Sequence, residues 1–468
     1  MSEPAFAVVG HPNKGKSSLG ATLARDMSVD VGPEPGTTRH TREFPMRLTG
    51  EPLYTLIDTP GFQRARAALE WMRRAEGDAA SRPAVVKRFI ETHAGDERFH
   101  DECELLRPIV DGAGIIYVVD GASPYGPEYE AEMEILRWTG RPSMAIINPI
   151  GAPRFVEPWE NALGQFFRVV RVLDVLKAPF LQQIEVLRAF GHLREDWRAP
   201  LDRAVEALLA QRRQQQADAA RLIAELIEQA LTYQETKDLA KDASTREPAR
   251  ALEERYRGRL RQLEREARGE VEAAYGYRQL ERQEADFELL ESDLLATETW
   301  LAFGLKKRDL VALGAAGGAL AGGIVDASLL GASFFAGSFI GGVIGGTAGF
   351  ISADRLTEVK VLEQPLGGIR LRCGPTKNLQ FPFVLLGRAR LHHGLVAART
   401  HAQRASLVLD SGTPALPLAD STKRRLARLF ERLRKTPPSD ATHAAAVDEL
   451  AEEIEQLFEE DAGATGSA

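Results

Sequence analysis

The chain has 468 residues, with 59 lysines and arginines against 67 aspartates and glutamates, which gives a formal net charge of -8. This length predicts two or three domains, and the acidic balance argues against a nucleic-acid-binding protein. The two cysteines, Cys103 and Cys373, have no paired spacing, which argues against a disulfide framework or a zinc site and suits a reducing compartment.

A glycine-rich loop lies near the N-terminus, between an apolar run and a segment with helical spacing. The apolar run is Ala5 to Val9, and the loop, Gly10 to Ser18, reads Gly-His-Pro-Asn-Lys-Gly-Lys-Ser-Ser. Glycines let the backbone turn successive N–H groups inward, and a helix N-terminus adds positive charge. The pattern therefore predicts a phosphate-binding P-loop, with a plain glycine turn as the alternative. We expect Lys16 to reach the β- and γ-phosphates and the Ser17 hydroxyl to bind magnesium.

The next elements are a loop and two strands that end in an acidic turn. Two prolines and two glycines mark residues 31–40 as a loop, and residues 44–48 and 53–57 have strand-like composition. The second strand ends in Asp58-Thr59-Pro60-Gly61. An aspartate about 40 residues after a P-loop suits magnesium binding. Gly61 is expected to bring its backbone N–H against the γ-phosphate.

These motifs resemble those of a known family. Gly10 to Ser18, Pro35 to His40 and Asp58 to Gly61 are similar to the first three motifs of the Era-like and TrmE-like branch of small GTPases. The resemblance covers about the first 180 residues. It implies a Ras-like α/β fold with a mixed, mainly parallel sheet and helices on both faces, and GTP and GDP as ligands.

The resemblance also implies roles for single residues. Thr38, or alternatively Thr37, would be the switch I threonine that closes over magnesium. Asn13 matches an asparagine that helps to bind potassium in some members, and Phe62 stands where Ras-type proteins place a catalytic glutamine. Because phenylalanine cannot orient a water molecule, hydrolysis would need potassium, a residue from a partner, or Gln63.

The implied nucleotide site is a defined set of residues. Its catalytic members are Lys16, Thr38 and Gly61, and its magnesium ligands are Ser17, Thr38 and Asp58. Mg2+ is the expected cofactor, and K+ is a second candidate. The residues expected to contact the nucleotide are Gly10, Asn13, Lys14, Gly15, Lys16, Ser17, Ser18, Asp58, Gly61 and Asn148.

The fourth and fifth GTPase motifs are incomplete. A strand at residues 143–148 ends in Asn148, but Gly151 stands where the family has an aspartate that accepts two hydrogen bonds from guanine. Losing such a bidentate contact costs on the order of a few kcal/mol of discrimination, so the preference for guanine should be weakened. In the fifth motif only Ala178 matches.

Residues 63–113 are long for the connection between the third motif and the next strand, which is the apolar run Gly114 to Asp120. This length indicates an insertion beside switch II. The insertion is either a lid or partner surface, or a helical decoration without a role in turnover. Helical patterns cover residues 67–74, 83–93, 100–111 and, after the strand, 128–139.

The middle of the chain is helical and highly charged. Residues 180–190, 200–232 and 247–303 are dense in Ala, Leu, Glu and Arg without a sustained heptad. We therefore expect a helical bundle or stalk in place of a coiled coil, and we assign its charges, among them Glu253 and Glu264, to a solvated face.

A glycine-rich apolar segment follows at residues 310–353, which contain a single charged residue. Gly337, Gly341, Gly345 and Gly349 repeat every fourth residue, which permits close helix contact. Basic residues at both ends suit a hairpin that enters the membrane and returns, with both ends on the cytoplasmic side. The alternative is a glycine-zipper hairpin buried within a soluble assembly.

The C-terminal part is expected to combine short strands with helices. His392, His393 and His401 fit solvated helix positions better than a metal site. The stretch from Cys373 to His393 resembles the C-terminal domain of a bacterial GTPase family of unknown function, which supports the architecture and supplies no activity. We expect strands at residues 358–362 and 369–373, helices at 383–400, 421–434 and 443–460, and a disordered tail from Asp461.

The sequence thus predicts an α/β Ras-like P-loop GTPase domain followed by a helical region, a glycine-rich hydrophobic hairpin and a small α+β domain. The expected bounds are residues 1–190 for the GTPase domain, 191–305 for the helical stalk or bundle, 306–355 for the hairpin and 356–468 for the α+β domain.

The expected function is that of a GTP-binding protein that hydrolyses GTP as a nucleotide-dependent switch. Alternatives are a nucleotide-gated scaffold with little hydrolysis and a dynamin-like membrane-remodelling NTPase. We expect a cytoplasmic protein that contacts the inner membrane through residues 310–353 and has no cleavable signal peptide at Met1 to Pro4. A protein partner of unknown identity and a homo-oligomer are further expectations, without a strong nucleic-acid signal.

Overall fold

The computed structural model describes residues 3–24, 41–48, 51–75, 77–240, 243–277, 351–355, 360–361, 364–365, 368–376, 378–379, 381–400 and 418–465. The chain forms two compact units. The N-terminal unit is Met1–Arg212 together with Ala398–Ala405, and the C-terminal unit is Arg213–Ala397 together with Ser406–Ala468. Helix α8 (Glu195–Thr232) contributes residues to both units. The division into four parts stays a prediction.

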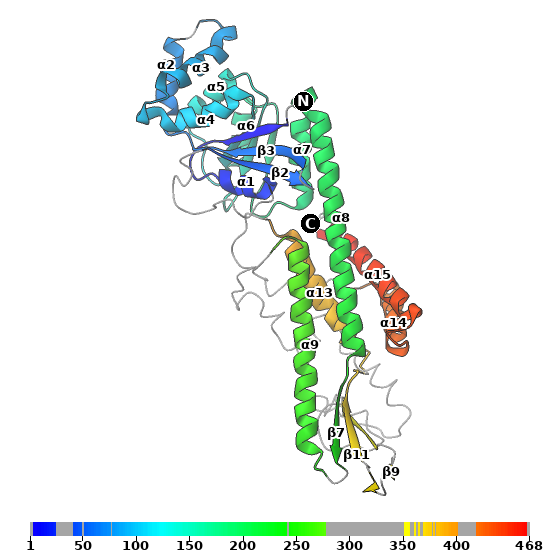
Figure 1. The fold of residues 1–468 in the computed structure, drawn as a ribbon. Coiled ribbons are helices and arrows are strands. Elements are labelled where there is room, and N and C mark those ends of the chain that lie inside the picture. Colours follow the sequence, from blue (N-terminus) through cyan, green and yellow to red (C-terminus); the bar gives the residue numbers. More distant parts are fainter. Residues whose placement is uncertain are drawn as a thin grey trace. The chain divides into compact units, whose positions relative to one another are not determined.

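The N-terminal unit is built around a six-stranded sheet in the order β2-β3-β1-β4-β5-β6 (Figure 1). Strand β2 is antiparallel to β3, and all other neighbouring strands are parallel. The expected mixed, mainly parallel topology is therefore confirmed. The strands are β1 (Ala5–Val9), β2 (Arg42–Leu48), β3 (Glu51–Asp58), β4 (Gly114–Asp120), β5 (Ser143–Asn148) and β6 (Val170–Val172).

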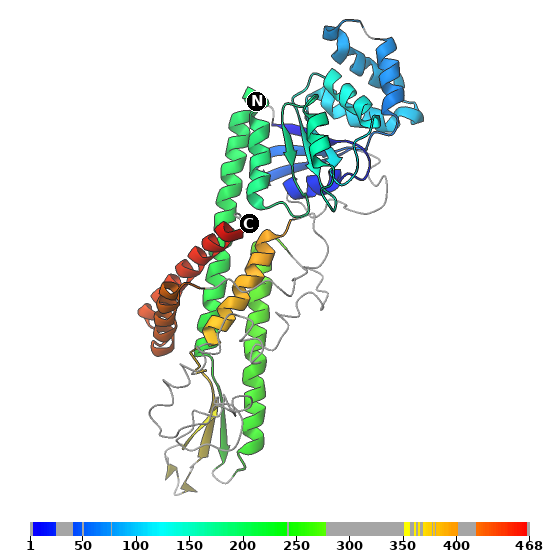
Figure 2. The ribbon, with the colours of Figure 1, turned by 180° about the vertical axis from the view of Figure 1, so that it is seen from behind.

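Helices cover both faces of this sheet, because its central strands are apolar on both sides. Every residue of β4 is buried, and β1 sends Phe6 and Val8 into one core and Ala7 and Val9 into the other. One face packs against α1 (Lys16–Ala24), α7 (Phe180–Gly191) and the start of α8. The opposite face (compare Figures 1 and 2) packs against α2 (Ala65–Arg74), α3 (Arg82–His93), α4 (His100–Asp111), α5 (Glu128–Trp138) and α6 (Val156–Leu163).

The helices between β3 and β4 lie where the sequence predicted helical patterns, and they belong to the core of the unit. Short 3-10 turns at Ala79–Ser81 and Glu97–Phe99 join them. The neighbouring rings of Trp71, Phe89, His93 and Phe99 have centroids 4.7 to 5.4 Å apart. The insertion is therefore continuous with the hydrophobic core on one face of the sheet.

The register brings the carboxyl ends of the strands together. Val8 in β1 is paired with Asp58 at the end of β3, and Asp120 at the end of β4 is paired with Asn148 at the end of β5. The glycine-rich loop leaves β1 at the same edge. Ligands of such sheets bind outside the carboxyl ends of the strands, so this edge is where a site is expected.

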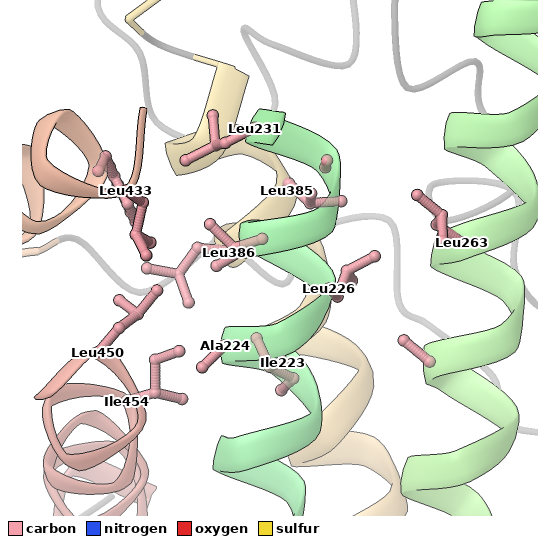
Figure 3. Packing of buried hydrophobic residues seen from close by; sticks show 14 of the residues in the cluster. Ile223, Ala224, Leu226, Leu231, Leu263, Leu385, Leu386, Leu433, Leu450 and Ile454 are labelled. Atoms are coloured by element: carbon pink, nitrogen blue, oxygen red, sulfur yellow. The ribbon is translucent and has the colours of Figure 1, made fainter. Parts of the chain in front are cut away.

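The C-terminal unit combines helices with a small antiparallel sheet. Figure 3 shows its core, in which Ile223, Leu263, Leu385, Leu433 and Ile454 come from five different helices. These helices are the end of α8, α9 (Arg246–Ala274), α13 (Phe381–Ala398), α14 (Asp420–Lys435) and α15 (Ala441–Thr465). The sheet has the order β7-β11-β8, formed by β7 (Glu235–Ala240), β11 (Gly368–Cys373) and β8 (Ile351–Arg355), and β9 (Lys360–Val361) pairs with β10 (Gln364–Pro365).

Two expectations for the helical region were wrong. The helix expected at residues 247–303 ends at Ala274, and Gly276 follows with a φ of +83°, a common way to stop a helix. Strand β7 was not predicted, because its sequence, Glu-Thr-Lys-Asp-Leu-Ala, is polar and takes the strand conformation by pairing with β11.

The last residues assigned to the glycine-rich hairpin form a strand instead. Ile351 to Ala353 belong to strand β8 and pair with β11, so the apolar segment cannot continue to residue 353. Residues 310–350 lie outside the described residues. Within the ranges that the structure describes, no helix is long and apolar enough to cross a membrane.

Charges on the middle helices are partly buried, contrary to the expected solvated face. Glu264 of α9 is buried, and its Oε1 lies 2.6 Å from Nε of Arg388 in α13. Glu253 is also buried and is paired with Arg257. A buried carboxylate needs a paired cation, and Glu264 has two: Arg268 on the same helix, at 2.7 Å, and Arg388, which is 124 positions away in the sequence.

The two described histidines of α13 are buried, so their assignment to solvated positions was wrong. Nε2 of His392 lies 3.1 Å from Oε1 of Glu272, and Nε2 of His393 lies 2.8 Å from the hydroxyl of Tyr275. Burial lowers the pKa of His392, although Glu272 opposes the shift. His401 is not among the described residues.

The expected disordered tail is also partly ordered. Helix α15 extends to Thr465, and the carboxylate of Asp461 forms an ion pair of 2.6 Å with Nη2 of Arg390. This pair fixes the end of the helix on α13, which a local reading of the acidic C-terminal sequence did not indicate.

Candidate nucleotide-binding site

The loop after β1 forms the centre of the site. Its backbone has positive φ at Gly10 (+139°), Asn13 (+62°) and Gly15 (+88°), and α1 begins at Lys16. A Cβ atom on Gly15 would lie 2.3 Å from Nδ2 of Asn148, so only glycine fits this approach. The loop therefore has the tight turn expected of a P-loop.

Lys16 lies buried against this loop. Its side chain is 8% exposed, and Nζ donates to the carbonyl oxygen of His11 at 3.0 Å. Burial lowers the pKa of the ammonium group to about 8, against the opposing effect of Asp58 and Glu132. An ammonium held in this place can bind phosphate oxygens.

Ser17 and Asp58 meet beside Lys16. Ser17 Oγ donates to Asp58 Oδ2 at 2.8 Å. A hydroxyl and a carboxylate are the hard oxygen donors that Mg2+ prefers, so this pair fits the expected magnesium site. The third expected ligand, Thr38, and its alternative Thr37 lie outside the described residues. Ser18, in the first turn of α1, is half-buried.

A buried carboxylate of α5, that of Glu132, contacts the P-loop through His11. Oε1 of Glu132 lies 2.9 Å from Nδ1 of His11, and its Oε2 accepts a hydrogen bond of 2.9 Å from the Tyr117 hydroxyl. The sequence reading missed Glu132, because it lies in an ordinary amphipathic helix. In the sequence, only His11 in the P-loop indicated that an acidic side chain contacts this loop.

Gly61 packs directly on the P-loop. A Cβ atom there would lie 2.7 Å from the backbone nitrogen of Pro12. The next residue, Phe62, donates its N–H to the carbonyl oxygen of Gly10 at 3.3 Å. The ring of Phe62 is 1% exposed and packs in the hydrophobic core, which gives it a structural role.

Helix α4 holds the backbone beyond Phe62. Oε1 of the fully buried Glu102 accepts hydrogen bonds from the backbone N–H of Gln63 at 2.9 Å and of Arg64 at 2.5 Å. Burial raises the pKa of the Glu102 carboxyl, against the two amide donors. Two residues further along the same helix, the Glu104 carbonyl oxygen accepts from the Thr41 hydroxyl at 3.2 Å.

Asn148 links the P-loop to the loop that follows β6. Its Nδ2 donates to the Lys14 carbonyl oxygen, and its Oδ1 accepts from the Val175 N–H, both at 3.2 Å. Gly151, three residues on, has a φ of +107° and open space where a Cβ atom would stand. The structure therefore brings Asn148 to the expected site and leaves position 151 without a carboxylate.

Asp120 stabilises the loops on this side. Its Oδ2 accepts from Ser123 Oγ at 2.5 Å and lies 3.5 Å from Lys14 Nζ, and its Oδ1 accepts from the Ile150 N–H at 3.3 Å. Partial burial alone would raise the pKa of this carboxyl, but these donors hold it below its ordinary value. Asp120 is thus an ionised anchor for the residues around Asn148.

Two family models match the chain. One, described as "Domain of unknown function (DUF3482)", matches residues 160–459, and the other, described as "50S ribosome-binding GTPase", matches residues 5–148. Among solved structures, an Era variant from Aquifex aeolicus bound to GDP and aluminium fluoride is 17% identical with a TM-score of 0.29, over 59% of this chain and 90% of that chain.

Curated relatives share the N-terminal part of the chain. GTPase Der of Burkholderia cenocepacia (strain HI2424) is 29% identical over 147 residues, which are 31% of this chain and 26% of that protein. The tRNA modification GTPase MnmE of Shouchella clausii (strain KSM-K16) is 30% identical over 168 residues, which are 35% of this chain and 34% of that protein. The chain therefore spans about a quarter to a third of the length of these relatives.

Proposed function

The chain belongs to the family of the domain of unknown function DUF3482 and carries a P-loop GTPase domain of the kind found in Der and MnmE, and on this basis we propose that it binds GTP and GDP and hydrolyses GTP as a nucleotide-dependent switch. The observation that carries the proposal is the 2.8 Å contact between Ser17 Oγ and Asp58 Oδ2 beside the buried Lys16. It supports the proposal because a phosphate-binding cation and two magnesium-type oxygens converge at one loop.

Four residues have defined roles in this proposal. Lys16 binds oxygens of the β- and γ-phosphates, and Ser17 and Asp58 hold Mg2+. Bound Mg2+ neutralises charge on the phosphate oxygens. Gly61 packs on Pro12 of the P-loop, where a Cβ atom would not fit, and its backbone N–H is assigned to the γ-phosphate.

The attacking water needs a group other than Phe62, whose ring is buried in the core. Besides a residue from a partner, two candidates come from this site: the exposed side chain of Gln63, and a potassium ion that the exposed Asn13 would help to bind. Multiple-turnover phosphate release in potassium and in sodium buffer of equal ionic strength separates them. Faster release in potassium supports the ion, and equal rates count against it.

The binding proposal is tested by calorimetry of the full chain with GTP, GDP and ATP. Lys16→Ala should weaken GTP binding by at least about 2 kcal/mol, since a buried charge-assisted contact is lost. Lys87→Ala removes an exposed lysine on α3 and serves as the matched control, with unchanged affinity. If Lys16→Ala binds GTP as tightly as the wild type, the P-loop assignment is wrong.

The proposal includes association of this switch with the inner membrane through the glycine-rich residues. Its support is compositional, because the segment has few charges, a four-residue glycine repeat and basic residues at both ends.

A further inference from the structure

The loop that follows β6, residues 174–178, is connected to the phosphate-binding loop. The Val175 N–H donates to Oδ1 of Asn148, whose Nδ2 binds the Lys14 carbonyl oxygen. Thr22 of α1 donates from Oγ1 to the Val175 carbonyl oxygen at 3.0 Å. A change in the position of this loop would therefore be transmitted to the backbone of the P-loop through the hydrogen bonds of Asn148.

Two further side chains hold the other end of the same loop. Gln183 of α7 donates from Nε2 to the Ala178 carbonyl oxygen at 3.0 Å. Thr400 donates from Oγ1 to the Leu176 carbonyl oxygen at 2.9 Å, although 224 positions separate these residues. Thr400 is 2% exposed, and it belongs to the N-terminal unit with the segment Ala398–Ala405.

The strand order places this loop where the base of a nucleotide would lie. The sheet runs β1-β4-β5-β6, so a ligand with its phosphates at the loop after β1 extends along the carboxyl edge toward the loops after β5 and β6. Gly151, after β5, offers no carboxylate to the base. Backbone groups of residues 174–178 must then supply more of the contact, and their position depends on what holds that loop.

We propose that Thr400 is a positioning residue of the nucleotide site, which orders residues 174–178 for a purine base. This inference rests on the proposed function. Thr400 lies in residues 160–459, which match the domain of unknown function, and is distant in sequence from residues 5–148, which match the GTPase model. Loss of the Thr400 hydroxyl should weaken binding of the base and leave binding of the phosphates unchanged.

The test compares GTP with inorganic tripolyphosphate, which has phosphates and no base. Both are titrated into the full-length protein with Mg2+. In Thr400→Val the GTP affinity should fall roughly three- to tenfold, the effect of one ordinary hydrogen bond, while the tripolyphosphate affinity stays unchanged. Thr400→Ser keeps the hydroxyl and should restore the GTP affinity.

Thr139→Val is the matched control. Thr139 is also buried in the N-terminal unit, and its Oγ1 donates to the Leu136 carbonyl oxygen at 2.6 Å, at the end of α5. This variant should bind GTP and tripolyphosphate like the wild type. Equal losses of both ligands in Thr400→Val, or no loss of GTP, would overturn the role of Thr400.

Hydrogen exchange of the wild type gives a second test without any variant. GTP should slow exchange of the Leu176 and Lys177 amides more than tripolyphosphate does, and equal protection by the two ligands contradicts the inference. The two proposals also fail differently. A wild type that binds no GTP ends both, whereas a wild type and a Thr400→Val variant that bind GTP equally end only this one.

Discussion

At the scale of single residues, the P-loop lysine is a buried cation between two carboxylates. Lys16 is buried, donates to the His11 carbonyl oxygen, and lies near the carboxylates of Asp58 and Glu132. Burial has the largest effect and lowers its pKa to about 8, so the ligand-free lysine loses its proton at a lower pH than an exposed lysine does. Phosphate oxygens favour the charged form, so triphosphate binding is coupled to protonation.

Triphosphate binding should therefore take up protons in alkaline buffer. With a pKa of about 8 for free Lys16, uptake should be small at pH 7 and clearly larger at pH 8.5, because bound Lys16 stays charged. The sign is fixed: the bound state holds more protons, so affinity falls as the pH rises through the pKa of the free lysine. Calorimetry in two buffers of different ionisation enthalpy measures the uptake, and an uptake that does not grow between these pH values contradicts the assignment.

Discrimination between bases is also decided by single residues. Because Gly151 offers no carboxylate, GTP should bind better than ATP by less than about 4 kcal/mol, below the 10⁴- to 10⁵-fold (about 5.5 to 7 kcal/mol) that a site pairing every polar group of its ligand can reach. Competition of GTP and ATP for the same protein measures the difference. A larger preference would mean that another group, outside position 151, reads the guanine.

At the scale of elements, α4 contacts two segments near the site: the residues just before α2 and the residue just before β2. Glu102 binds the backbone at the start of α2, and Glu104 binds Thr41 at the start of β2. These two contacts attach the insertion to the segments that, in the proposed function, adjoin the two switch regions. This favours a role for the insertion in the switch over a purely decorative one.

Removing the Glu102 carboxylate should release the backbone of Gln63 and Arg64. In Glu102→Leu these two amides should exchange with solvent at least about tenfold faster, since each loses its acceptor. Glu102→Gln keeps an acceptor oxygen and should retain protection. Glu104→Gln, on the same helix, should leave both amides unchanged. Identical exchange in Glu102→Leu and the wild type would show that α4 does not hold this segment.

The same residue predicts a pH dependence. The folded-state pKa of Glu102 is raised above its ordinary value of 4.5, so the folded protein binds the proton more tightly than the unfolded chain. The contribution to the free energy of unfolding is present at low pH and is lost as the pH rises through the raised pKa. Glu102→Gln should remove this part of the pH profile in urea unfolding.

At the scale of the whole molecule, the proposed membrane association through the glycine-rich residues has a direct test. If residues 310–350 enter the bilayer, the full chain should fractionate with membranes and resist extraction by high salt, which screens charges and leaves buried apolar area unaffected. Deleting residues 306–350 should release the chain while GTP binding survives, because the N-terminal unit has its own two cores. The deletion stops before β8, since Ile351 to Arg355 belong to the C-terminal sheet.

The glycine repeat distinguishes the two readings of that segment. Gly341→Leu and Gly345→Leu add apolar area, so a membrane hairpin should stay inserted but lose close helix packing. A wild type that is monodisperse without detergent, together with variants that aggregate, would identify a hairpin packed inside a soluble protein and refute the membrane assignment.

The sequence alone determined the features that depend on local chemistry. Gly10 to Ser18 and Asp58 to Gly61 predicted the loop and the acidic strand end, because phosphate and magnesium binding need particular residues at short spacing. Helix α4 was predicted at its observed bounds, His100–Asp111, and β5 at Ser143–Asn148, because hydrophobic periodicity reports which face is buried.

Only the tertiary structure decided which partner each buried polar group has. Glu132 reaches His11 across 121 positions, Glu264 reaches Arg388 across 124, and Thr400 reaches Leu176 across 224. A charged residue in an amphipathic helix is expected to be solvated, and the sequence alone does not show which distant segment supplies the partner that compensates its burial. Strands β7 and β8 also depend on a distant segment. The sequence of β7 is polar and that of β8 follows a glycine-rich stretch, and both form strands by pairing with β11.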